Sequence, residues 1–270
     1  MRIFAATMAT TVAVLLATAA TAAAAPTWAP ASSATVHPGV QVLTNGAQCT
    51  ANFVFYDASN VYLGQAAHCS STGDNTATNG CDTQSLPLGT PVDITGASKP
   101  GTLVYNSWIA MQNAGETDAN TCAYNDLALV KIDPADLGNV NPSIPFWGGP
   151  TGLATSTTQG ETVLSYGNSE LRGGVEQLSP KQGKSLGDDA DGWTHEVATV
   201  TPGIPGDSGS AFINENGQAF GILSTLEIAP TPGGNGVGDL SRELNYAASH
   251  GAPVTLATGT EPFTGPLLPI

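Results

Sequence analysis

Basic residues are scarce in this sequence. Seven Lys and Arg residues stand against 22 Asp and Glu, and the formal net charge is −15 at pH 7. Phosphate backbones and anionic lipid surfaces are bound through clusters of Lys and Arg. The scarcity argues against nucleic acid as a partner and against docking on an anionic membrane.

Charged residues of both signs together make up only 11% of the chain. Solvent-facing helices are usually rich in Lys and Glu, and such surfaces are missing here. The 32 glycines and the many Thr, Ser and Asn residues are typical of short strands joined by tight turns. The composition therefore predicts a mostly β protein.

The first 25 residues carry a single charge, Arg2, followed by an Ala-, Val- and Leu-rich run that closes with small residues around Ala20 to Ala25. This pattern predicts a signal peptide over residues 1–25 and a secreted, extracellular protein. A membrane anchor is the alternative, but five threonines dilute the run and Ala-x-Ala spacings end it. Removal leaves 270 − 25 = 245 residues, enough for one large domain or two joined halves.

All cysteines lie in the first half of the chain, and none forms a Cys-x-x-Cys pair. Together with their irregular spacing, this argues against a four-cysteine zinc site, and the histidines show no metal-ligand spacing either. An even number of cysteines behind an export signal predicts two disulfide bonds, with three pairings open. We expect no metal and no organic cofactor. The cysteines are Cys49, Cys69, Cys81 and Cys122.

Strand-like runs bounded by turn residues occur on both sides of a Pro- and Gly-rich segment at residues 136–160. We interpret this segment as a connection between two halves, at residues 40–135 and 161–237, preceded by an N-terminal segment at 26–39.

Only one segment has a clear helical pattern. Asp239 can cap its N-terminus, Gly251 can close its C-terminus, and its apolar residues fall on one face. We expect a helix from Asp239 to His250, within a C-terminal region of residues 238–270.

The run Gly206-Asp207-Ser208-Gly209 can supply a nucleophile. A serine hydroxyl is weak at neutral pH, so acyl transfer needs a base that takes its proton and donors that hold the oxyanion. The flanking glycines let the chain turn sharply, so that the N–H groups of Gly206 and Ser208 can point into one pocket. By themselves these residues are also ordinary turn chemistry, which leaves a purely structural role equally open.

Two motifs precede this run, Ala66-Ala67-His68-Cys69 and Asn125-Asp126-Leu127-Ala128-Leu129. In the order His, Asp, Ser, the sequence resembles the chymotrypsin-like (trypsin-like, S1-type) serine peptidases of the secreted bacterial type, over roughly Val40 to Leu226. The resemblance implies an all-β fold of two packed six-stranded antiparallel β-barrels with a C-terminal helix. The first barrel would carry His68 and Asp126, and the second would carry Ser208.

The resemblance also implies roles. Ser208 would attack the carbonyl carbon, His68 would accept the serine proton, and Asp126 would orient His68. Gly206 and Ser208 would supply the oxyanion hole. The family disulfide beside the histidine implies the pairs Cys49–Cys69 and Cys81–Cys122. Substrate would pair with the strand after the nucleophile, whose serine in the family hydrogen-bonds the triad aspartate; these residues are Ser224, Thr225 and Leu226.

Several positions depart from the family. Bacterial relatives neutralise the aspartate before the nucleophile, here Asp207, with an internal arginine, and Arg172 is our candidate for this ion pair. Ile204 replaces a cysteine, so the second half lacks the disulfide beside its pocket. Pro202 stands where trypsin-like members have an aspartate, which argues against Arg or Lys specificity. Leu226 replaces a glycine and would narrow the substrate-binding pocket.

These observations predict a secreted, monomeric serine endopeptidase that hydrolyses polypeptides through an acyl-enzyme, with an apolar or small residue before the scissile bond. Two alternatives remain: a binding protein on the same scaffold whose triad is blocked, and an esterase that uses the same triad.

Overall fold

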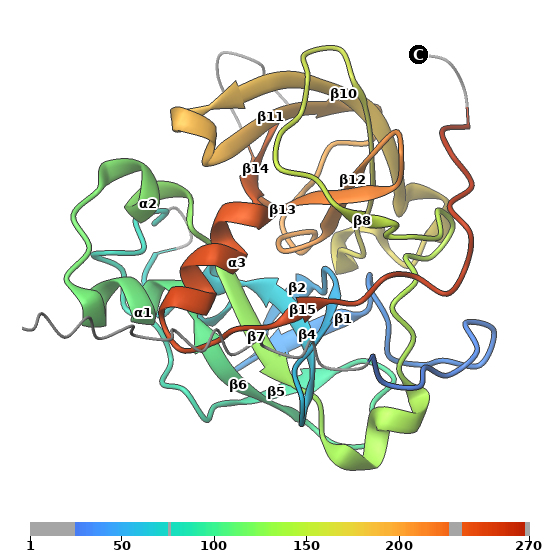
Figure 1. Ribbon diagram of the computed structural model, residues 1–270, viewed down its shortest axis with the longest axis horizontal. Coiled ribbons are helices and arrows are strands. Elements are labelled where there is room, and N and C mark those ends of the chain that lie inside the picture. The colour runs from blue at the N-terminus through green and yellow to red at the C-terminus, as the bar shows by residue number, and fades with distance from the viewer. Residues whose placement is uncertain (1–24, 75–76, 227–233, 268–270) are drawn as a thin grey trace, which may run out of the picture.

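The computed structural model describes residues 25–74, 77–226 and 234–267. The predicted signal peptide therefore lies outside the described residues, apart from Ala25. The chain forms two antiparallel sheets, one from each half, which lie one above the other in Figure 1. No helix in the described ranges has the length and apolar character needed to cross a membrane.

The first sheet contains eight strands in the order β15-β3-β4-β7-β6-β5-β1-β2. β2 and β3 are two parts of one bent strand, because the residues between them form backbone hydrogen bonds with the neighbouring segments on both sides. The Ala51 N–H donates to Val40 O beside β1, and the Asn52 N–H donates to Gly64 O on β4. Backbone pairing thus continues around the first half. The strands are β1 (Gln41–Thr44), β2 (Ala47–Thr50), β3 (Val54–Tyr56), β4 (Val61–Ala66), β5 (Pro91–Ile94), β6 (Gly101–Asn106), β7 (Leu127–Lys131) and β15 (Thr255–Leu256).

The second sheet closes into a barrel of six strands, because β12 pairs with both β9 and β13. The predicted all-β fold is confirmed. β8 from the Pro- and Gly-rich connection joins this sheet in parallel, and β15 from the C-terminal tail joins the first. The strands are β8 (Gly152–Leu153), β9 (Thr162–Tyr166), β10 (Pro180–Asp189), β11 (Thr194–Thr199), β12 (Ala211–Asn214), β13 (Gln218–Leu226) and β14 (Asn235–Asp239).

The C-terminal helix lies where the sequence predicts it. α3 spans Leu240–Ser249, and the Asp239 side chain caps it by accepting a hydrogen bond from the Arg242 N–H. Residues on α3 contact strands of both sheets, so the helix bridges the two halves (Figure 1).

Two further helices have no clear pattern in the sequence. α1 (Ser107–Ala114) and α2 (Ala119–Tyr124) follow β6, and each is capped by a side chain, Asn106 and Asp118 respectively. Neither helix has the sustained apolar periodicity that marks a helix in sequence; α1 is held by burial of Trp108 in the first core. The described residues also form five short 3₁₀ helices: η1 (Ala67–Ser70), η2 (Pro134–Asn139), η3 (Glu170–Arg172), η4 (Glu176–Leu178) and η5 (Ala190–Gly192).

A buried apolar cluster joins the two halves. It combines Phe53 and Leu129 of the first sheet with Leu164 and Ile222 of the second, and it includes Leu240 of α3. Separate cores fill the first half and the second half. Residues that project into the junction are therefore positioned by two packed bodies that cannot shift independently.

His195, which the sequence marks only as an ordinary surface or core histidine, lies completely buried on β11. Its Nδ1 is 2.7 Å from Asp188 Oδ1 and its Nε2 is 3.0 Å from Asp239 Oδ2. Because carboxylates only accept, the ring can donate to both of them only when both of its nitrogens carry protons, so these contacts favour the imidazolium form. Burial alone would lower the pKa of His195, but the hydrogen bonds and charges of Asp239 and Asp188 outweigh it and raise the pKa.

Replacing His195 with Asn is expected to lower the free energy of unfolding by about 3 kcal/mol at mildly acidic pH, because Asp239 then lies buried without a cation. The folded-state pKa lies above the unfolded value of about 6.5, so this stabilisation is full below that pH and is lost as pH rises through the folded pKa. Urea unfolding of both proteins between about pH 5.5 and about pH 9 measures the difference. A difference that does not shrink as pH rises would contradict the assignment.

Candidate active site

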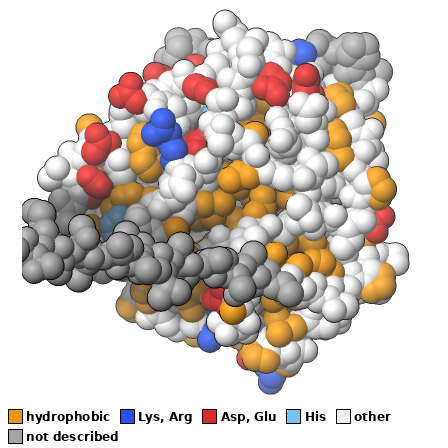
Figure 2. All heavy atoms as spheres, viewed as in Figure 1, with side chains coloured by type: hydrophobic (Ala, Val, Ile, Leu, Met, Phe, Trp, Pro, Cys, Tyr) orange, Lys and Arg blue, Asp and Glu red, His pale blue; other side chains and the backbone are white. Residues whose placement is uncertain are grey.

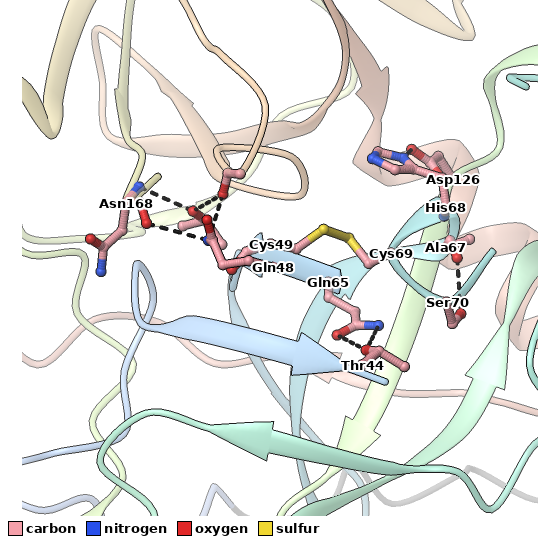
Figure 3. The surroundings of a disulfide bond; sticks show 12 residues. Thr44, Gln48, Cys49, Gln65, Ala67, His68, Cys69, Ser70, Asp126 and Asn168 are labelled. Carbon is pink, nitrogen blue, oxygen red and sulfur yellow. Dashed lines mark hydrogen bonds and ion pairs between the residues drawn. A yellow bond between two sulfur atoms is a disulfide. The ribbon is translucent and has the colours of Figure 1, made fainter. Parts of the chain in front are cut away.

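His68 and Asp126 meet at the junction side of the first sheet. His68 lies in η1, directly after β4, and Asp126 lies directly before β7, the strand that pairs with β4. His68 Nδ1 is 2.7 Å from Asp126 Oδ2, and the His68 backbone N–H donates to Asp126 Oδ1 at 2.9 Å. Both carboxylate oxygens of the buried Asp126 therefore bond one histidine, and Figure 3 shows the two side chains next to each other.

This contact sets the charge state of His68. Burial alone would lower the pKa of the ring, but the charge of Asp126 and its hydrogen bond outweigh that effect, and the net pKa is raised. The Nδ1 proton is fixed toward Asp126, which leaves Nε2 as the acceptor when the ring is neutral. The His68 side chain remains 26% exposed, so it is accessible from the junction.

Ser208 is brought to the same junction by backbone contacts. Its carbonyl accepts a hydrogen bond from the Thr50 N–H at 2.9 Å, and Thr50 follows Cys49, which is bonded to Cys69 beside His68. Gly209 packs so closely that a Cβ there would lie 2.7 Å from Ala66 N, and its φ is +83°. Only glycine fits both conditions, so Gly209 allows the loop that carries Ser208 to pack against the end of β4.

The backbone around Gly206 is held by two side chains of β2 that sequence reasoning missed. The Gly206 carbonyl accepts from Gln48 Nε2 at 2.9 Å and from Thr50 Oγ1 at 2.8 Å. Among the described residues, the N–H groups of Gly206 and Ser208 donate no hydrogen bond. Two unpaired donors on one fixed loop are the requirement for an oxyanion site. Gln48 and Thr50 carry no sequence signal, because a polar residue on a strand reveals nothing about a partner more than 150 residues away.

Asp207, the residue before Ser208, is completely buried. Arg172 Nη2 lies 2.5 Å from its Oδ2, and Lys181 Nζ, also completely buried, lies 3.0 Å from the same oxygen. The Ser169 N–H donates to the other oxygen at 3.0 Å. Burial lowers the pKa of Lys181; the charge of Asp207 opposes this and that of Arg172 adds to it. Lys181 was not foreseen, since the alternating pattern of β10 does not reveal that its lysine faces inward.

Solved structures share this arrangement of strands. Thermobifida fusca protease A superimposes with a TM-score of 0.55 at 18% identity, over 83% of this chain and 99% of that one. A glutamic-acid-specific serine protease, described as using a histidine triad in substrate binding, has a TM-score of 0.52 at 17% identity, over 82% of this chain and 100% of that one. No family model and no curated protein matches the sequence. The chain has a chymotrypsin-like serine protease fold.

The four cysteines of the first half form two disulfide bonds, Cys49–Cys69 and Cys81–Cys122. The sulfur atoms of the first pair lie within 4.8 Å of a ring nitrogen of His68. In the described ranges, this is the one group of His, Cys, Asp or Glu side chains close enough together to hold a metal ion. Its cysteines are oxidised and cannot act as thiolate ligands. The second pair ties the loop after η1 to α2. The fold thus uses its cysteines to fix the segment that carries His68.

The expected hydrogen bond from Ser224 is absent. Ser224 Oγ is buried and has no hydrogen-bond partner among the described residues. The pairing of β13 with β14 shifts register between Leu223 and Thr225, so Ser224 lies at an irregularity in the strand, and such irregularities redirect a side chain. Asp126 already bonds His68 through both oxygens.

The substrate-binding region of the chymotrypsin-like fold is described in part. Leu226 is 48% exposed at the end of β13, and residues 227–233 beyond it lie outside the described residues. The Pro202 carbonyl accepts a hydrogen bond from Arg172 at 2.9 Å, which ties this stretch to the Asp207 ion pair. A separate apolar pocket of about 580 Å³ contains Trp147, Tyr166 and Val200, and none of the predicted site residues lines it.

We expect Arg172→Ala and Lys181→Met each to lower the free energy of unfolding by about 3 kcal/mol, because each removes one cation from a buried carboxylate. Lys184→Met is the matched control on β10, since Lys184 bonds Thr162 and not Asp207. Lys184→Met should lower the free energy of unfolding by about 1 kcal/mol or less. Urea unfolding measures all three variants, and equal effects at Lys181 and Lys184 would show that Asp207 does not depend on Lys181.

Proposed function

We propose that this protein is a secreted serine endopeptidase that hydrolyses peptide bonds through an acyl-enzyme on Ser208. The observation that carries the proposal is the His68–Asp126 contact, 2.7 Å long, beside a loop that presents Ser208 and two unpaired N–H groups. A nucleophile, an oriented base and oxyanion donors are the three parts that acyl transfer requires.

In this proposal neutral His68 takes the proton of Ser208 Oγ through Nε2 while the oxygen attacks the substrate carbonyl. The N–H groups of Gly206 and Ser208 stabilise the negative oxygen that forms. His68, now charged, is stabilised by Asp126 and gives its proton to the leaving amine. Water then attacks the acyl-enzyme by the same route and releases the acid.

The loop contacts support a preformed oxyanion site. Gln48 and Thr50 both bond the Gly206 carbonyl, and Asp207 anchors the same loop through Arg172 and Lys181, so the backbone on either side of the two proposed donors is fixed. Donors that are fixed before substrate arrives need no reorganisation during the reaction, and one such donor is worth about 100-fold or more in rate.

Three further features support the substrate class and location. The chain is strongly acidic, with a formal net charge of −15, and the face in Figure 2 has no continuous basic patch, which argues against a phosphate backbone as the ligand. Pro202 offers no charge to a Lys or Arg side chain, so we infer an apolar or small residue before the scissile bond. Two disulfides behind an N-terminal export pattern support secretion.

We expect a phosphonylating probe to label the secreted protein at Ser208. Labelling should disappear in Ser208→Ala and persist in Ser210→Ala, a control from the same loop. Mass spectrometry of the labelled peptide identifies the serine. An unlabelled wild-type protein would favour the blocked binding protein, and hydrolysis of esters without any cleavage of a peptide library would favour the esterase.

The pH dependence of kcat/KM should follow His68, which must be neutral to act as the base. Because the pKa of His68 is raised, activity should increase with pH and reach half its maximum above the ordinary histidine value of about 6.5. Initial rates on a peptide substrate between about pH 5 and about pH 9 measure the midpoint. A midpoint below the ordinary value would contradict the role given to Asp126.

A further inference from the structure

A second carboxyl group lies behind the candidate triad. Glu243 on α3 is completely buried, and its Oε1 accepts a hydrogen bond from the backbone N–H of Asp126 at 2.9 Å. Its Oε2 is also buried and has no hydrogen-bond partner among the described residues. Sequence reasoning placed Glu243 only within the predicted C-terminal helix and gave it no role.

Two hydrogen bonds hold the backbone of Asp126, in addition to those of its carboxylate. The Ala67 N–H donates to Asp126 O at 2.5 Å, and Glu243 accepts from Asp126 N. The first contact ties Asp126 to the segment that carries His68. The second ties it to α3, which contacts both sheets.

The charged surroundings of Glu243 are acidic. Asp126 lies directly before β7 and Asp239 at the N-terminus of α3, and the negative charge of each acts on Glu243. Asp239 itself accepts from the Arg242 N–H through Oδ1 and bonds His195 through Oδ2. Tyr105 on β6 lies near enough that a negative Glu243 would raise the pKa of Tyr105 further. In the described part of the chain, no Lys, Arg or His forms an ion pair with Glu243.

A carboxylate in this position would be a buried charge beside two negative neighbours without a cation, which is strongly unfavourable. Burial raises the pKa of Glu243 well above its ordinary value. The hydrogen bond from Asp126 opposes this rise, and the charges of Asp126 and Asp239 add to it. A protonated carboxyl keeps Oε1 as an acceptor for the Asp126 N–H and carries its proton on Oε2.

We propose that Glu243 is a positioning residue of the triad: a neutral, protonated carboxyl group that anchors the backbone of Asp126 and thereby aims its carboxylate at His68. This inference rests on the proposed function. Neutrality matters because an ionised Glu243 would add a second negative charge behind Asp126, and negative charge on this side of His68 favours its protonated form, which cannot act as the base.

Three variants test the proposal. Glu243→Gln replaces a protonated carboxyl by a neutral amide of the same shape, which keeps the acceptor for Asp126. Glu243→Leu removes the acceptor. Asn245→Ala is the control, since Asn245 is exposed on the same helix.

Activity and NMR report on positioning. Glu243→Gln should keep kcat within about threefold and leave the midpoint of the acid limb unchanged, whereas Glu243→Leu should lower kcat by about 10- to 100-fold with little change in KM. The low-field signal of the His68 Nδ1 proton should persist in the Gln variant and weaken in the Leu variant. A lowered acid-limb midpoint or a lowered His68 pKa in Glu243→Gln would show that Glu243 is ionised and would overturn the proposal.

The pH dependence of folding stability reports whether Glu243 is protonated, and this measurement does not depend on catalytic activity. The unfolded chain releases the proton of Glu243 above about pH 4.3, while the folded protein keeps it, so the wild type loses stability relative to Glu243→Gln as pH rises from about 4.5 to about 7. Melting temperatures measure this. A difference between the two proteins that stays constant over this range contradicts the proposal, even if Glu243→Leu does not fold. Should the wild type cleave no peptide, the proposed function fails, while the NMR and melting results still decide the role of Glu243.

Discussion

A buried carboxylate needs a cation or several hydrogen-bond donors, and three such carboxylates organise this molecule. Asp126 is held by His68, Asp207 by Arg172 and Lys181, and Asp239 by His195. Each pairing fixes a different part of the junction: the base, the loop before Ser208 and the start of α3. Two further acids are buried in the described residues. Asp136 accepts hydrogen bonds from the Ser98 and Lys99 N–H groups, whereas Glu243 has no cation, and neutrality is the state that its surroundings favour.

Sequence reasoning reached the features that local motifs encode. The glycines around Ser208, the residues beside His68 and Asp126, the cysteine spacing and the cap at Asp239 each act over a few residues or resemble a known pattern. It missed Gln48, Thr50, Lys181 and Glu243, which are polar residues whose importance comes from partners far away in the chain. It also missed α1 and α2, because tertiary packing of Trp108 and not periodicity stabilises the first of them.

The chemistry and the specificity of the proposed enzyme rest on different parts of the structure. The residues proposed for bond cleavage lie on short segments next to strands of both sheets, and the two sheets share one apolar core. The pocket depends on the end of β13, where the register shift at Ser224 and the exposed Leu226 depart from the pattern that the resemblance implies. In the proposed enzyme, the groups for bond cleavage are therefore held by packed elements, whereas side-chain selection depends on a region in which this chain departs from the family pattern.

The central claim is that Ser208 becomes acylated by a polypeptide. Rapid acid quenching of the protein during turnover of a peptide substrate, followed by mass spectrometry of the peptide that contains Ser208, tests it most directly. We expect that peptide to gain the mass of the substrate's acyl part, and we expect no such gain in His68→Ala. Peptide hydrolysis at full rate in Ser208→Ala would contradict the claim.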